Sequence, residues 1–231
     1  CYQFFFFVIM KKKQKEGIKM TKEEKYIMTR MASNLYMQTK GKIGIEYVES
    51  EACVQWCVYN EMIKKENDKM RALFEQSRNG MDIEKELDAV YQQKQDYCIE
   101  KIHAEAQLHI SEKGLSSQKQ IEKYVFERMA VLLSITSQTI NDEVFALISW
   151  YTFSENEKQI NKKISEQYRK SRFKNSDTSS LQDLMNEKNK IQAERFKYAA
   201  ILNKIAHANG NKATPLQIAS EKKTKKKTKG R

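Results

Sequence analysis

Proline and glycine are scarce in this sequence. Of its 231 residues, one is proline, Pro215, and seven are glycine. Proline breaks a helix because it has no N–H to donate, and glycine weakens a helix because its backbone is conformationally free. The chain therefore has few places at which a helix must stop. Long helices and an all-α fold are predicted.

Cysteine is also rare. The chain has four cysteines, at positions 1, 53, 57 and 98, which are too few and too irregularly spaced for the disulfide framework of a secreted protein. Cys53 and Cys57 lie one helical turn apart beside Val54 and Trp56, so we interpret them as packed, reduced thiols. A zinc site would need a second ligand pair with suitable spacing, and the sequence has none. A reducing compartment and no bound metal are predicted.

Motifs of catalysis are missing as well. The sequence has no glycine-rich phosphate loop, no serine nucleophile elbow and no helix with two histidines at metal-ligand spacing. Its carboxylates are scattered among lysines on helical faces, a pattern typical of solvated ion pairs and not of an acid–base pair in a cleft. We predict a non-catalytic chain without cofactor or small-molecule substrate.

A strongly apolar run, CYQFFFFVIM, opens the chain. The run is too short to span a bilayer, and no basic segment precedes it as in a signal peptide. Residues 1–20 are therefore treated as an N-terminal extension that carries no functional argument. No membrane partner is predicted.

Positive charge is what the chain has in excess. Lysine and arginine number 42 against 30 acidic residues, a net charge of +12 that favours a polyanionic or acidic partner. Residues 211–231 form a lysine-rich tail that we expect to be disordered. The tail could bind DNA or RNA nonspecifically or serve as a nuclear import signal, or it could be merely solvated. The lysines proposed to contact nucleic acid there are Lys222, Lys223, Lys225, Lys226 and Lys227.

Residues 21–114 have the pattern of a helical hairpin. Thr21 and Glu24 form a possible capping box that opens a first helix, which runs to about Thr39. Long apolar-periodic segments follow over about 48–79 and 82–113, separated by Asn79-Gly80. Two long helices with so short a break predict an antiparallel hairpin. We expect this hairpin to dock a larger partner protein.

Residues 115–175 are predicted to form a three-helix unit. Ser117 with Gln120 caps its first helix, and Asn141 is a plausible N-cap for the second. After Thr152-Phe153, Ser154 and Glu157 form another possible capping box, which indicates that the chain stops and restarts there. A tight turn between two helices is the layout of a helix-turn-helix, whose second helix can lie in a DNA groove.

The last helix of this unit has two unlike faces. Steps of about 100° per residue place Ile160, Ile164 and Tyr168 on one side, where they can pack. The opposite side is cationic, without acidic residues, and is predicted to bind nucleic acid through Lys158, Lys162, Ser165, Arg169 and Arg172. The alternative is the ordinary charged outer face of a surface helix in a lysine-rich protein.

A family resemblance adds to this interpretation. Residues 147–154, LISWYTFS, are similar to the end of helix two and the turn of homeodomain-like proteins, and residues 157–160, EKQI, look like the start of their recognition helix, two residues late. The Trp-Phe-x-Asn core of that helix is replaced by Lys163, Ile164, Ser165 and Glu166. The resemblance therefore implies DNA contact without an adenine-reading asparagine.

One more helix is predicted over residues 176–210, and we expect it to pack on the hairpin or on a partner. In size and layout the chain resembles the homeobox-like accessory subunits of ciliate adenine DNA methyltransferase complexes. That resemblance implies a nuclear, non-catalytic DNA-binding subunit whose catalytic partner holds the methyl donor. The alternative is a structural helical subunit of a ciliary, ribosomal or mitochondrial assembly.

Overall fold

The computed structural model describes residues 20–79, 81–136, 141–171 and 178–210. Within these residues the chain forms helices and no strand, so the predicted all-α class is confirmed. The helices are α2 (Lys22–Thr39), α3 (Ile45–Arg78), α4 (Glu84–Gln107), α5 (Gln118–Thr136), α6 (Asp142–Ser171) and α7 (Thr178–Ala208). The long lengths of α3, α6 and α7 follow from the scarcity of helix-breaking residues.

Three of the predicted helix starts are confirmed. The Thr21 side chain accepts from the N–H of Glu24, and the Glu24 carboxylate accepts from the N–H of Thr21, at 3.1 and 2.8 Å. Ser117 and Gln120 form the same reciprocal pair at the start of α5. Asn141 Oδ1 accepts from the N–H three residues later at 2.8 Å and so caps α6. The sequence predicts these helix starts correctly because both partners of each capping bond lie within one helical turn.

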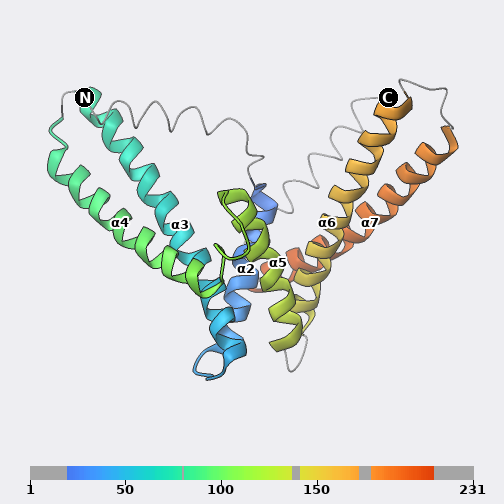
Figure 1. Ribbon diagram of the computed structural model, residues 1–231, viewed down its shortest axis with the longest axis horizontal. Helices are drawn as coiled ribbons and strands as arrows, with labels where there is room; N and C mark the ends of the chain where they lie inside the picture. The colour runs from blue at the N-terminus through green and yellow to red at the C-terminus, as the bar shows by residue number, and fades with distance from the viewer. Residues whose placement is uncertain (1–19, 80, 137–140, 172–177, 211–231) are drawn as a thin grey trace.

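The helices form two arms that diverge from a common base (Figure 1). One arm is the pair α3 and α4, and the other is the pair α6 and α7, each packed along its length. α2 and α5 lie between the arms and contact each other. α2 also contacts α3 and α6, and so does α5, so these two short helices join the arms.

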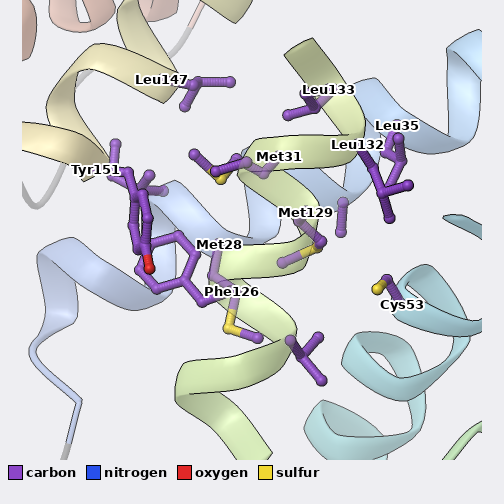
Figure 2. Close-up of a cluster of buried hydrophobic side chains, with 14 of the residues drawn as sticks. Met28, Met31, Leu35, Cys53, Phe126, Met129, Leu132, Leu133, Leu147 and Tyr151 are labelled. Atoms are coloured by element: carbon purple, nitrogen blue, oxygen red, sulfur yellow. The ribbon is translucent and has the colours of Figure 1, made fainter. Parts of the chain in front are cut away.

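The core lies at the junction of α2, α3, α5 and α6 (Figure 2). It is rich in sulfur: Met31, Cys53 and Met129 are fully buried, and Cys57 Sγ lies 3.8 Å from Met129 Sδ. Unbranched methionine side chains adapt to the irregular space between helices that cross at different angles. Phe126 of α5 meets Tyr151 of α6 with ring centroids 4.5 Å apart, which closes one side of the cluster.

Ion pairs between helices surround this core. Arg128 of α5 binds Glu49 of α3 through two hydrogen bonds of 2.7 and 2.6 Å. Arg30 of α2 binds Glu143 of α6, with Nε 2.8 Å from Oε1. Each pair joins a central helix to one arm, so the arms are held at the base by charge as well as by apolar packing.

The turn predicted at Thr152-Phe153 is wrong, and so is the capping box of Ser154 and Glu157. α6 is one continuous helix from Asp142 to Ser171. The described part of residues 115–175 therefore contains two helices, α5 and α6, and not the three predicted. A helix-turn-helix requires that turn, so no separate recognition helix begins after Ser154.

The packing of α6 explains why the helix continues. Ser154 is only 6% exposed, so its position faces the packed side of α6 and not a helix end. Glu157 does not turn back to the Ser154 backbone, because Arg195 of α7 holds it with Nε and Oε2 3.0 Å apart. Thr152 Oγ1 donates to the Ile148 carbonyl at 3.0 Å, a bond that a continuous helix accommodates.

For the last helix, packing on the hairpin is wrong, whereas packing on a partner stays a prediction. α7 lies along α6 and, among the described residues, makes no helix–helix contact with the α3–α4 hairpin. Its buried residues Ala199 and Leu202 join the core cluster, and Arg195 reaches Glu23 of α2 at 3.5 Å.

Candidate nucleic-acid interface

The predicted cationic face lies on the outer half of α6. Near the base, α6 is anchored by Val144, Leu147 and Trp150, all at most 1% exposed. Beyond Ile160, which is 3% exposed, the side chains that α6 turns away from α7 meet solvent. The outer half of α6 thus belongs to an arm and not to the core, so a long ligand could reach it.

Lys158 is not available to a ligand, because two carboxylates bind its ammonium. Its ammonium lies 2.7 Å from Glu24 of α2 and 2.6 Å from Glu155 of α6. Burial lowers the pKa of Lys158, but the hydrogen bonds to the two carboxylates outweigh burial, and the pKa is raised. Burial alone would raise the pKa of Glu24. The hydrogen bonds from Lys158 and from the Thr21 backbone outweigh burial, so the pKa of Glu24 is lowered. Lys158 therefore ties α6 to the start of α2.

Lys162, Ser165 and Arg169 do lie on one exposed face. Neither cation has a carboxylate within 4 Å among the described residues. Ser165 Oγ donates to the Asn161 carbonyl at 2.8 Å, and it keeps a lone pair but no free proton for a ligand. Lys162 and Arg169 are therefore the residues of the predicted stripe that remain available to a phosphate. Arg172 and the five tail lysines fall outside the described residues.

Lys163 extends this surface, although the helical wheel placed it outside the stripe. Its side chain is exposed and has no acidic partner among the described residues. It projects about 100° from Lys162 around the helix. Long, flexible lysine side chains bridge that angle easily. We define the α6 basic surface as Lys162, Lys163 and Arg169.

Positive charge is not spread over the helical body. Residues 1–20 and 211–231 together hold 13 of the 42 basic residues and 2 of the 30 acidic ones. Residues 21–210 therefore carry 29 basic and 28 acidic residues, a net charge of +1. Against this nearly neutral body the α6 basic surface is a local feature. A polyanion would meet it at close range and would not be attracted by the body as a whole.

Other chemistries find little support in the described residues. No group of three or more histidine, cysteine, aspartate or glutamate side chains there could hold a metal ion. None of the described helices is long and apolar enough to cross a membrane. Burial raises the pKa of Cys53 to about 12 and that of Cys57 well above its ordinary value, so both thiols stay protonated within the core.

Comparisons with known proteins give no family. No family model matches the chain, and searches of curated proteins and of solved structures also found no match. The likeness to homeodomain-like proteins stays a prediction from residues 147–160, without the turn that it required.

Proposed function

We propose that the protein is a non-catalytic helical accessory subunit that binds DNA nonspecifically. The observation that carries the proposal is the α6 basic surface, three exposed cations with no carboxylate within 4 Å among the described residues, on an arm that extends from the core. Phosphate contacts by lysine and arginine give affinity without base specificity. Within a nuclear complex, a larger catalytic subunit such as an adenine DNA methyltransferase would supply the chemistry.

A salt titration tests this proposal. Anisotropy of a labelled duplex of about 20 base pairs is measured against the full chain at several salt concentrations. Changing Lys162, Lys163 and Arg169 together to glutamate should weaken binding about tenfold or more and flatten the slope of log affinity against log salt by about 2 to 3. Removing residues 211–231 should weaken binding further.

The matched control changes Lys85, Lys119 and Lys204 to glutamate. These exposed lysines lie on different helices, so the control alters the net charge equally without creating one acidic face. It should weaken binding by no more than about threefold. Equal losses in both variants would show that only the overall charge matters and would reject the α6 basic surface.

A structural subunit is the second candidate. Two observations favour it: Lys158 is held by Glu24 and Glu155, and the body between residues 21 and 210 is almost neutral. On this hypothesis the two arms position other proteins and any DNA binding comes from the tail alone. Binding that disappears with the tail and ignores the α6 substitutions would favour this second function.

A further inference from the structure

A groove separates α2 from the first half of α3. Its volume is about 730 Å³, within the range of binding sites for drug-sized ligands. Met28, Ala32 and Val54 form its floor and are 7–9% exposed, whereas Tyr36 and Val58 on its walls are 48% and 44% exposed. The groove is thus an apolar surface that the described residues leave partly uncovered.

The groove has the dimensions of a helix-binding site. Lining residues on α2 recur at steps of three and four from Lys25 to Lys40, and this stretch rises about 22 Å, or four helical turns. The backbone groups of α2 and α3 are bonded within their own helices, so no strand edge is offered to an extended peptide. An apolar face at helical spacing is therefore the ligand shape that fits.

The residues that line this groove include more lysines than acidic residues. Lys25, Lys40, Lys42 and Lys65 have no carboxylate within 4 Å among the described residues. Lys40 and Lys42 instead lie over tyrosine rings, 5.8 and 5.6 Å from the centroids. Lys64 is neutralised by Glu61 at 2.6 Å. In a body of net charge +1, such a rim favours an occupant with acidic flanks.

From this geometry we infer that the α2–α3 groove docks an amphipathic helix of a partner protein, with an apolar stripe flanked by aspartate or glutamate. The apolar stripe covers Met28, Val54 and Val58, and the acidic flanks meet the rim lysines. Apolar contact supplies most of the affinity, and the charges select the partner and set the orientation. The site is separate from the α6 basic surface and does not depend on DNA binding.

The test uses a labelled synthetic peptide of about 18 residues with leucines at helical spacing and glutamates on both flanks. Anisotropy with the full chain should show saturable binding. Val58→Glu should weaken it about tenfold or more, and Lys25→Glu with Lys65→Glu by about fivefold or more. A peptide whose flanks carry lysine should bind wild type weakly and bind the double variant better. This charge reversal cannot be produced by misfolding.

Matched controls lie outside the groove. Ile102→Glu places a charge at an apolar residue of α4 that is 60% exposed, and Lys85→Glu with Lys119→Glu repeats the charge change at exposed positions. Both should bind the acidic peptide like wild type, and circular dichroism should show the same helix content in all variants. Absence of saturable binding, or equal losses in groove and control variants, would overturn the inference.

Two measurements test the other possible occupants of the groove. Sedimentation velocity without peptide tests a second copy of the chain, and peptide binding by a shortened chain tests its own N-terminal residues. Concentration-dependent self-association that Val58→Glu abolishes would assign the groove to a second copy, whose α4 exposes Tyr91, Ile99 and Ile102 among acidic residues. Peptide binding by a chain that starts at Met20 but not by the whole chain would assign it to the chain's own apolar residues 4–9. Either result would replace the partner protein as occupant.

Discussion

At the scale of single residues, ion pairs decide which predicted cations are free. Lys158 and Lys162 lie one turn apart on α6, and sequence spacing treats them alike. Lys158 meets Glu24 because α2 contacts α6, whereas Lys162, one turn further along, is exposed and has no carboxylate within 4 Å among the described residues. The same residue type therefore serves the fold at one position and is available to a ligand at the next.

Replacing Lys158 by methionine should reveal this difference as a pH-dependent loss of stability. The pKa of Glu24 is lowered from 4.5 in the folded chain, so its ion pair stabilises the fold above that pH and loses this effect as the pH falls through the lowered pKa. Because Lys158 is half exposed, solvent screening limits the loss at neutral pH to about 1 kcal/mol or less.

Urea unfolding between pH 7 and about pH 3 measures this loss, which should shrink toward the acid end. Lys162→Met is the control, since no carboxylate lies within 4 Å of its ammonium among the described residues, and its stability should stay within about 0.5 kcal/mol of wild type at every pH. A loss for Lys158→Met that is the same at all pH values would show that its contribution is packing and not charge.

At the scale of the helix, the continuity of α6 is the main departure from the pattern in the sequence. Proline at position 155 would distinguish a helix that begins after Ser154 from the continuous helix α6. If Ser154 were an N-cap, residue 155 would be the first helical position, where proline is tolerated. In the continuous helix, proline there removes the hydrogen bond to the Tyr151 carbonyl and clashes with that turn.

Glu155→Pro should therefore lower the free energy of unfolding by about 3 kcal/mol or more. Glu155→Ala serves as the control, because it removes the same ion pairs with Lys158 and Lys123 without affecting the backbone. It should cost about 1 kcal/mol or less. Chemical denaturation of both variants provides the measurement, and equal stabilities would restore the predicted turn.

At the scale of the whole molecule, burial is concentrated at the base. Every residue of the core cluster on α3 and α4 lies at or before Cys57 or at or after Ala104. The outer part of this arm instead exposes Phe74 and Tyr91, at 43% and 51%, because two helices alone cannot cover their apolar faces. The α3–α4 arm is therefore held by the base and loses packing with distance from it.

Hydrogen exchange should follow this gradient. Amides of residues 27–35 and 121–133, which supply the central core, should exchange about a hundredfold or more slowly than those of residues 68–95. Mass spectrometry of peptic fragments measures both regions in one sample. Equal protection along α3 would indicate that the arm is stabilised by something other than the base.

Much of the helical layout was present in the sequence. Few glycines and a single proline allow long helices, and short-range signals such as Thr21 with Glu24 and Asn141 mark where helices begin, because both partners of each bond lie within one turn. The apolar periodicity placed Ile160 and Tyr168 on a packing face of α6; Ile160 is 3% exposed, whereas Tyr168 is 50% exposed. For the candidate site, the sequence identified Lys162 and Arg169 as outward-facing.

The sequence by itself determined the all-α class, the capped starts of α2, α5 and α6 and the position of the basic segment, since these depend on neighbours along the chain. Only the tertiary structure decided that α6 continues through Ser154, that Lys158 is occupied and that a groove opens between α2 and α3. Glu24 and Arg195, which hold Lys158 and Glu157, come from distant segments. Periodicity within one helix carries no information about which distant charge will face it.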